Sequence, residues 1–266
     1  MSFADLIAKA LDVNAANLAL GNQQFRAEGA TFVRNPGGPK IYDANHVCDI
    51  TASTPSEIER LMAHVEREFD GFSHRRFDTD FRTPPAVIAR LVFEGYERSD
   101  ALVMLLEGDL TGTAPEHDIR AVASEADWQA YTSLQSVDWR EYRERTNRPV
   151  EEDVGRMQML SRRLKQPPVQ YWIAYVGGRP AAYFNSWAGI DGVGQVEDLF
   201  THPDFRRRGL ATALIHHCVA ECRGAGAGPV VIAADPTDTP KQMYAAMGFR
   251  PAAIATHYLK KLPPGS

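Results

Sequence analysis

Arg206-Arg207-Arg208-Gly209-Leu210-Ala211 is the stretch that decides the fold, because it lies between an apolar run and a helical run. The apolar run ends at Val196-Glu197-Asp198-Leu199-Phe200-Thr201, and the helical run begins at Thr212. The first backbone amides of a helix have no hydrogen-bond partner inside the helix. Where a strand leads through a glycine-containing loop into a helix, these amides can bind an anion. Gly209 lets the backbone approach that anion closely, and the arginines add positive charge. The stretch predicts a phosphate-binding loop; an arginine-rich helix start on a solvated surface is the alternative.

The order of elements around this loop resembles that of the GCN5-related N-acetyltransferase (GNAT) family, whose acetyl-CoA loop reads Gln/Arg-x-x-Gly-x-Gly/Ala. A second match lies in Met243-Tyr244-Ala245-Ala246-Met247-Gly248-Phe249, which is similar to the late Tyr-x-x-x-Gly-Phe element of the family. An apolar run at 230–234 separates the two motifs, as a strand does in the family. The resemblance covers residues 117–262 and implies an N-acetyltransferase domain that uses acetyl-CoA as co-substrate.

The resemblance also implies roles for named residues. The backbone of Leu199, Phe200 and Thr201 would contact the pantetheine arm and the thioester carbonyl, where the fourth and fifth strands of the family diverge. Tyr244 would lie near the cofactor sulfur as general acid or positioning hydroxyl, with ordinary packing of its ring as the alternative. The cofactor diphosphate would lie on the loop and the helix start, formed by Arg206, Arg207, Arg208, Gly209, Leu210, Ala211 and Thr212.

Glu197 is the candidate general base, because members of the family often carry a glutamate on this strand. Successive side chains of a strand point to opposite faces, so only one of Glu197 and Asp198 is expected to face the substrate. We expect Asp198 to turn to the other side and to pair with a helix; Asp198 or water stays open as the base. Many family members have an asparagine seven residues before the tyrosine, where this chain has Thr237. The hydrogen bond of that asparagine to the pantetheine could come from Thr237 or from Asp238.

Hydrophobic periodicity and turn residues predict the secondary structure of the second half of the chain. Ser124 is expected to cap a helix, and Gly177-Gly178 is expected to join a hairpin. The order predicts an α/β (α+β) fold with a mixed, mostly antiparallel central sheet flanked by helices. The expected elements are a strand at 118–122, helices from 124 and over 151–165, strands at 170–176, 180–187 and 193–200, a helix over 209–223, a strand at 230–234, a helix over 240–247 and a strand at 254–259.

The loop 110–116, rich in small and turn residues, is the predicted boundary between a region 1–112 and the domain 117–262. The stretch Asn35-Pro36-Gly37-Gly38-Pro39 predicts a hairpin turn between strands at 32–34 and 40–42. The expected elements that follow are a strand at 46–50, a helix over 54–69, a strand at 75–80, a helix from 84 to 95 and a strand at 101–106.

The first region shows a weak internal repeat of the second. Asp80…Pro85…Gly95-Tyr96 corresponds to Asp235…Pro240…Gly248-Phe249, and an apolar strand follows each. The repeat favours a degenerate GNAT-like copy in tandem with the second domain, although any strand-helix-strand unit with Pro and Gly at its turns has a similar pattern. Only Thr51-Ala52-Ser53 lies between the expected strand and helix of the first region. This region therefore has no cofactor loop, and we expect it to be a structural or substrate-facing partner.

Composition excludes several classes of function. The chain has 266 residues, 44% of them hydrophobic, and a formal net charge of −5, which disfavours general affinity for nucleic acid. No apolar run reaches the roughly 20 residues of a membrane span, and the N-terminus lacks the basic region of a secretory signal. The odd number of cysteines, Cys48, Cys218 and Cys222, fits a reducing cytoplasm. We expect a cytoplasmic protein without nucleic-acid or membrane partners, as a monomer or homodimer.

Three features leave the binding chemistry open. Cys218 and Cys222 lie four residues apart on an expected helix, where burial in a core is favoured over a metal site, so no metal is expected. Aromatic residues such as Trp128 and Trp139 could line an amine pocket through cation–π contacts, or simply form the core. The polar cluster 43–46 could face the substrate or form a turn network.

Three interpretations of function follow. The leading one is transfer of an acetyl group from acetyl-CoA to a primary amine by direct attack in a ternary complex, because no Cys or Ser lies in a recognisable nucleophile motif. The second is a non-catalytic CoA-binding or interaction module. The third is a tandem acyltransferase that resembles mycothiol synthase. The acceptor itself cannot be read from the fold, because many amines pass through it.

Overall fold

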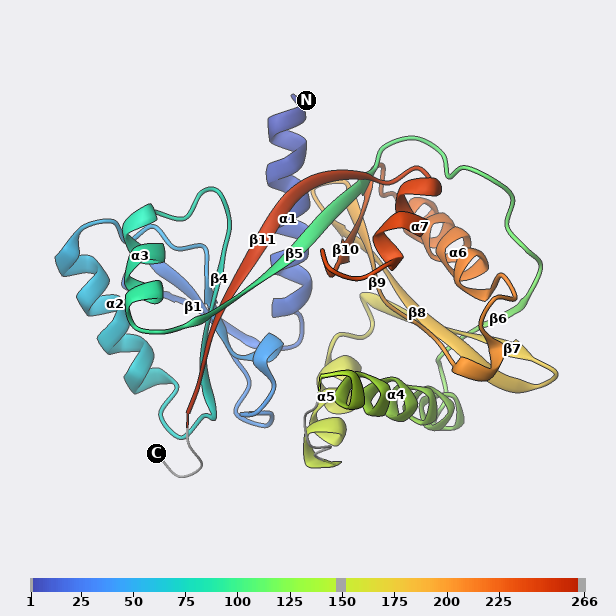
Figure 1. Cartoon of the computed structure of the whole chain (residues 1–266), viewed down its shortest axis with the longest axis horizontal. Coiled ribbons are helices and arrows are strands. Elements are labelled where there is room, and N and C mark those ends of the chain that lie inside the picture. The colour runs from blue at the N-terminus through green and yellow to red at the C-terminus, as the bar shows by residue number, and fades with distance from the viewer. Residues whose placement is uncertain (1, 147–151, 263–266) are drawn as a thin grey trace.

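The computed structural model describes residues 2–146 and 152–262, and within them it contains one continuous eleven-stranded sheet with helices on both faces (Figure 1). The strands are β1 (Gln23–Ala27), β2 (Ala30–Arg34), β3 (His46–Cys48), β4 (His74–Thr79), β5 (Glu97–Leu106), β6 (Asp118–Ala121), β7 (Val169–Val176), β8 (Arg179–Ile190), β9 (Val193–Thr201), β10 (Val230–Ala234) and β11 (Arg250–Lys261). The helices are α1 (Phe3–Ala19), α2 (Pro55–Glu68), α3 (Pro85–Phe93), α4 (Glu125–Arg145), α5 (Glu152–Leu164), α6 (Leu210–Gly224) and α7 (Pro240–Ala246), with short 3-10 turns η1 (Tyr42–Ala44) and η2 (Pro203–Phe205).

The strand order is β1-β2-β3-β4-β11-β5-β10-β9-β8-β7-β6. The pairs β3/β4 and β9/β10 are parallel, and the other pairs are antiparallel. The predicted fold class, a mixed and mostly antiparallel sheet flanked by helices, is therefore confirmed.

The same series of elements occurs twice along the chain. Each series has a hairpin, a third antiparallel strand, a helix, a parallel strand, a helix and a last strand: β1-β2-β3-α2-β4-α3-β5, and then β7-β8-β9-α6-β10-α7-β11. The last strands are exchanged, because β5 pairs with β10 and β11 pairs with β4. β5 and β11 also pair with each other and cross the middle of the molecule together (Figure 1). The sheet is thus continuous across the predicted boundary at residue 112, and the division into two domains stays a prediction.

Helix α1 belongs to the first region in sequence but packs on the sheet of the second. Its buried Leu6, Ala10 and Val13 share a core cluster with Trp128 and Phe200. No element was expected over these residues. A signal was available, because Ser2 and Asp5 form a capping box and the apolar residues recur at helical spacing.

The hairpin expected at 32–42 is wrong. The first hairpin joins β1 to β2 through Glu28 and Gly29, whose φ values of 47° and 73° suit a two-residue turn. The stretch 35–41 is instead a loop held by the side chain of Asn45, which donates to the carbonyl oxygens of Gly38 (2.8 Å) and Ile41 (2.9 Å). These carbonyl groups would pair with a neighbouring strand in a hairpin. Here the buried side-chain amide of Asn45 supplies their hydrogen bonds instead.

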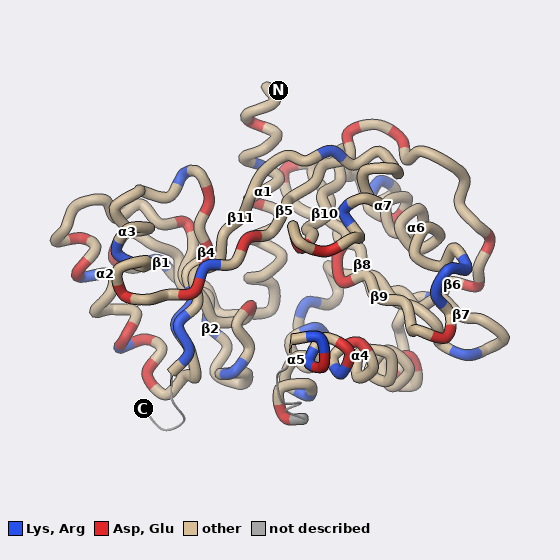
Figure 2. The backbone as a smooth tube through the Cα atoms, viewed as in Figure 1, with Lys and Arg blue, Asp and Glu red and all other residues tan. Residues whose placement is uncertain are grey.

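The remaining expected elements agree with the structure to within a few residues, apart from β5 and β11, which are longer than expected. Thr54 and Ser124 cap α2 and α4 as predicted. Cys218 and Cys222 are buried in the core beneath α6, as the core interpretation predicted. Acidic and basic residues are interspersed over both halves (Figure 2). In the described part of the chain, no helix is both long and apolar enough to cross a membrane.

Candidate functional site

β9 and β10 diverge after a short contact, which opens a gap in the pairing of the sheet. They pair only where Val230 meets Gly194 and Val231 meets Gln195. Beyond Gln195, the edge of β9 that faces β10 has no partner strand among the described residues, whereas the other edge stays paired with β8 as far as Thr201. Backbone groups at such an edge need a partner from elsewhere. Residues 199–201, predicted to contact the pantetheine, lie on this edge.

The loop after β9 leads into the start of α6 without a side-chain cap. Arg207 and Gly209 have left-handed backbone conformations, with φ values of 64° and 79°. Among the described residues, none of the amides of 207–212 donates a hydrogen bond, and the first bonded amide is that of Ala213, which donates to the Gly209 carbonyl oxygen (2.9 Å). Free amides at a helix N-terminus form a binding site for an anion.

The loop is fixed from behind by the segment that leads into β6. A Cβ added at Gly209 would lie 3.0 Å from Pro115 Cγ, so a larger residue would press on Pro115. His117 Nε2 donates to the carbonyl oxygen of Arg208 at 3.0 Å. Such contacts hold the loop in place and favour glycine at position 209 on grounds of both space and backbone conformation.

The arginine side chains are exposed, and two of them are engaged with the protein. Arg206 donates to the Thr201 carbonyl oxygen (3.0 Å) and pairs with Glu141 of α4 (2.6 Å). Arg208 donates to the Asp204 carbonyl oxygen at 3.3 Å. The backbone amides are therefore better placed than the guanidinium groups to act as the main anion ligands.

A bulge in β9 changes the expected directions of Glu197 and Asp198. Tyr183 pairs with Phe200 and Asn185 with Glu197, so two steps on β8 correspond to three on β9, and Asp198 has a φ of 63°. Both carboxylates therefore line the same cavity, and the expectation that only one would face it is wrong. The expected pairing of Asp198 with a helix is confirmed.

The partner of Asp198 is Arg162 on α5, whose Nη2 lies 3.0 Å and Nε 3.1 Å from Asp198 Oδ2. Asn185 donates to the same oxygen at 3.3 Å. Asp198 is thus neutralised by a fixed cation, which leaves Glu197 as the candidate base.

Glu197 is half-buried and accepts a hydrogen bond from Gln195 Nε2 at 3.2 Å. Burial raises the pKa of Glu197 to about 7, and the charge of Asp198 adds to this effect. A carboxyl group with a pKa near neutrality can accept a proton and release it again under working conditions.

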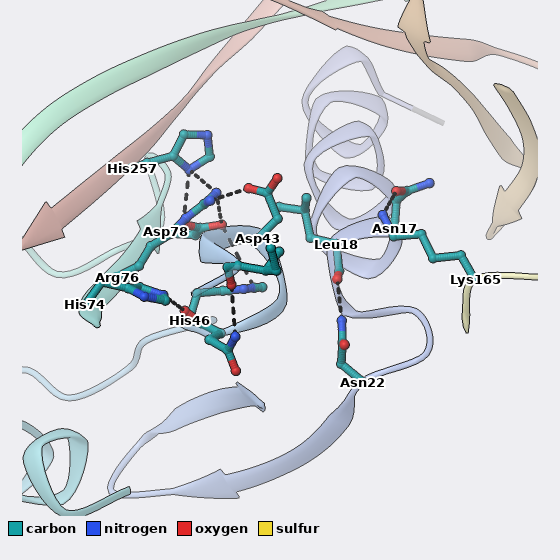
Figure 3. Close-up of polar contacts among 12 residues, drawn as sticks. Asn17, Leu18, Asn22, Asp43, His46, His74, Arg76, Asp78, Lys165 and His257 are labelled. Atoms are coloured by element: carbon teal, nitrogen blue, oxygen red, sulfur yellow. Dashed lines mark hydrogen bonds and ion pairs between the residues drawn. The ribbon is translucent and has the colours of Figure 1, made fainter. Parts of the chain in front are cut away.

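The cavity in front of Glu197 has a volume of about 60 Å³ and is formed by both halves of the chain. Asp43, which lies in η1 and belongs to the polar cluster 43–46, reaches it from the first half. Behind Asp43, the buried Arg76 binds both Asp43 and Asp78 (Figure 3). Although burial opposes it, the Arg76 guanidinium holds the pKa of Asp43 below its usual range. The other residues that line the cavity are Leu18, Ile41, Gln158, Ser161, Arg162, Lys165, Glu197 and Asp198.

Tyr244 is buried on α7, with its ring centroid 6.2 Å from that of Phe249. Burial raises the pKa of Tyr244 to about 12, so the phenol keeps its proton at neutral pH. The described residues offer its hydroxyl no hydrogen-bond partner. The hydroxyl is therefore free to donate, and its predicted role near the sulfur stays a prediction.

Thr237 lies in a turn that uses its own polar groups. Its hydroxyl donates to Asp235 Oδ1 (2.6 Å), and so does its amide (2.7 Å). Asp238 accepts from Arg145 of α4 at 3.0 Å. The Thr237 hydroxyl can still accept a hydrogen bond, and a contact with the pantetheine stays a prediction.

Several residues of the cavity were missed by sequence reasoning. Arg162 on α5 and Lys165, directly after α5, belong to no recognised sequence motif. Asn17 is buried on the apolar face of α1 and accepts from Lys165 Nζ at 2.8 Å (Figure 3). A single polar residue on an apolar helical face was the available signal. Trp128 lies in the core and Trp139 lines a separate groove between α4 and α5, so the aromatic residues do not line this cavity.

Residues 128–249 match the Acetyltransferase (GNAT) family. This part of the chain is a GNAT domain. The match spans the free amides of the loop, the bulge of β9 and Tyr244. Membership of the family implies an acetyl-CoA co-substrate and an acceptor substrate. No match was found among curated proteins.

The GNAT domain and the first half together have counterparts among solved structures. A GCN5-related N-acetyltransferase from Kribbella flavida is 19% identical, with 97% of this chain and 96% of that chain covered and a TM-score of 0.70. A conserved protein of unknown function from Staphylococcus epidermidis is 15% identical over 91% and 95% of the two chains, also with a TM-score of 0.70. A tandem GNAT protein from the clavulanic acid biosynthesis pathway is 14% identical over 89% and 79%, with a TM-score of 0.59. At these identities the likeness is one of fold.

Proposed function

We propose that the protein is an N-acetyltransferase that transfers the acetyl group of acetyl-CoA to a primary amine by direct attack in a ternary complex. The observation that carries the proposal is the start of α6, beside the diverging edge of β9, where the amides of 207–212 have no hydrogen-bond partner among the described residues. Amides that point outward from a helix start suit the diphosphate of CoA, and an unpaired strand edge suits its amide-bearing pantetheine arm.

The residues present fit this co-substrate. The amides of 207–212 would hold the diphosphate, and the backbone of 199–201 would hold the pantetheine and donate to the carbonyl oxygen as it gains charge. A preformed donor of this kind contributes about 2.7–4 kcal/mol to transition-state stabilisation in other enzymes. Acetyl-CoA supplies the acetyl group as a thioester, so a carbon–nitrogen bond forms, the carbon–sulfur bond breaks and CoA departs as a thiol.

Glu197 takes the proton that the amine must lose. With its pKa raised to about 7 by burial, the carboxylate is ionised above neutrality, and only that form accepts a proton. Tyr244 supplies the proton that the departing sulfur takes up, since its pKa of about 12 keeps the phenol protonated. The rate at low substrate concentration should therefore rise with pH through about 7 and then level off.

The first half, residues 1–112, is proposed to be a degenerate GNAT-like copy in tandem with the domain 117–262, an arrangement that resembles mycothiol synthase. The repeated series of elements and the two parallel strand pairs support this. In the proposed arrangement only the second copy binds the cofactor, and the first supplies Asp43 to the cavity.

The proposal is tested by mixing the protein with acetyl-CoA and a panel of primary amines and measuring the free thiol of CoA with a thiol-reactive dye. We expect thiol release that depends on the amine and equals the acetylated amine formed. Initial rates over both substrates should give intersecting double-reciprocal lines; parallel lines would contradict direct attack. CoA binding with no thiol release from any amine would identify the non-catalytic CoA-binding module instead.

A further inference from the structure

The cavity in front of Glu197 contains more charge than the proton transfer requires. Two of its carboxylates have a fixed counterion. Asp198 pairs with Arg162 at 3.0 Å. Asp43 pairs with Arg76, and Arg76 also forms an ion pair of 2.6 Å with Asp78. The Asp198–Arg162 pair is neutral, whereas Asp43, Asp78 and Arg76 together keep one excess negative charge, which Arg76 holds on the first-half side of the cavity.

Lys165 and Glu197 line the same cavity and are not matched in this way. Lys165 Nζ donates to the neutral amide of Asn17 at 2.8 Å, and Glu197 accepts from the neutral amide of Gln195 at 3.2 Å. In the described part of the chain, no carboxylate lies within ion-pair distance of Lys165, and no cation lies within ion-pair distance of Glu197. The cavity thus presents one cation and one carboxylate, each hydrogen-bonded to a neutral amide and each without an oppositely charged group within ion-pair distance among the described residues.

Asn17 makes this arrangement depend on the first half of the chain. Its side chain is only 2% exposed, and its oxygen fixes the ammonium group of Lys165 at the cavity wall (Figure 3). The neighbouring Asn14 accepts from Gln195 at 3.1 Å, and Gln195 in turn donates to Glu197. Helix α1 therefore positions both unmatched charges, although it lies outside the GNAT domain.

We propose that the acceptor is a zwitterionic α-amino acid, whose carboxylate pairs with Lys165 while its amino group lies at Glu197. The proposal rests on the proposed transferase function and names its substrate class. A ligand with one negative and one positive group can pair with both Lys165 and Glu197. A polyamine would place a second cation beside Lys165, where like charges repel and are poorly hydrated.

The test is a calorimetric titration of the full chain, saturated with CoA, with each L-amino acid and with its α-carboxamide. We expect at least one amino acid to bind about tenfold more tightly than its carboxamide, because only the carboxylate pairs with Lys165. Equal affinity for the two forms, tighter binding of the carboxamide, or binding of neither form would overturn the proposal. This comparison uses the unmodified protein and does not depend on how a variant folds.

Variants then assign the preference to Lys165. Lys165→Met should remove the difference between amino acid and carboxamide, and Lys165→Arg should keep it. The control Lys9→Met, which removes a lysine charge from α1 outside the cavity, should also keep it. If Lys165→Met weakened both ligands equally, Lys165 would have a structural role only and the proposal would fail.

Thiol release separates this proposal from the proposed function. Release with carboxylate-free amines at least as fast as with amino acids would leave the transferase in place and overturn the amino-acid acceptor. No release with any amine, together with CoA-dependent and carboxylate-dependent binding, would overturn the transferase and support the binding site.

Discussion

Helices α2 and α6 hold the same place in the two halves of the sheet, between a strand and its parallel neighbour, but their first turns differ. In α2 the amides of Ser53 and Thr54 donate to the Glu57 carboxylate at 3.0 and 2.9 Å, and the Thr54 hydroxyl accepts from the Glu57 amide at 3.4 Å. These hydrogen bonds lower the pKa of Glu57 to about 2. The start of α2 is thus occupied by its own carboxylate, whereas the start of α6 is left open.

The difference shows how one fold supports two roles. A helix N-terminus attracts negative charge, and a capping glutamate satisfies that attraction inside the chain. Gly209 has no side chain with which to do so, and in the proposed function the anion is the diphosphate of CoA. We infer that the second half binds the co-substrate, while the first half contributes a wall of the acceptor cavity and half of the central strands.

The largest expected effect comes from separating the two halves at residue 112. A fragment 113–266 loses β5, which pairs with both β10 and β11, and β4, which also pairs with β11. It also loses α1, which covers one face of its sheet. We expect no cooperative unfolding transition and no activity, measured by circular dichroism and thiol release. Residues 1–112, supplied by co-expression, should restore both. A folded and fully active fragment would show that the halves are independent.

Glu197→Gln tests whether the chemistry belongs to the second half alone. Loss of a general base lowers kcat by about a hundredfold to ten-thousandfold, and the rise of activity through pH 7 should disappear with it. Glu57→Gln removes a carboxylate from the first half and should leave kcat and the pH profile unchanged. Equal losses in the two variants, measured by thiol release from pH 5.5 to 9, would contradict the assignment of the base.

Gly209→Ala and Gly95→Ala compare one substitution in the two halves. Both glycines have a φ of 79°, so alanine carries the same backbone penalty of about 1–2 kcal/mol. A Cβ at Gly95 meets nothing within 4 Å, whereas at Gly209 it meets Pro115 and displaces the loop. We expect Gly209→Ala to weaken CoA binding about tenfold by calorimetry and Gly95→Ala to leave it unchanged. Weaker CoA binding in both variants would indicate a general loss of stability and not a specific effect on the loop.

Thr54→Ala has the smallest expected effect. Removing the cap of α2 costs about 0.5–2 kcal/mol of the free energy of unfolding, because the Glu57 amide loses its acceptor. Affinity for CoA should not change, as the start of α2 binds no ligand. Urea denaturation and CoA calorimetry measure the two quantities. A change in CoA affinity without a change in stability would indicate that the cofactor binds at the start of α2 and not at the start of α6.

Local sequence signals predicted much of this structure, and the misses have physical causes. Helix caps such as Thr54 and Ser124, and the paired glycines 177 and 178, act within a few residues, so their elements were found. The exchange of β5 and β11 depends on pairing between residues far apart in the chain, which a single sequence does not reveal. The bulge at Asp198 breaks the alternation on which the assignment of its face was based. Asn17 and Lys165 meet only because α1 crosses to the second half.

The most direct test is a titration of the full chain with CoA, followed by the backbone amide resonances in NMR spectra. If the uncapped helix start is the cofactor site, the amide resonances of 207–212 should shift strongly as CoA binds, while those of residues 53, 54, 56 and 57 should stay in place. Shifts of the amide resonances at the start of α2, or CoA binding that leaves the resonances of 207–212 unchanged, would contradict the assignment of the cofactor site to α6.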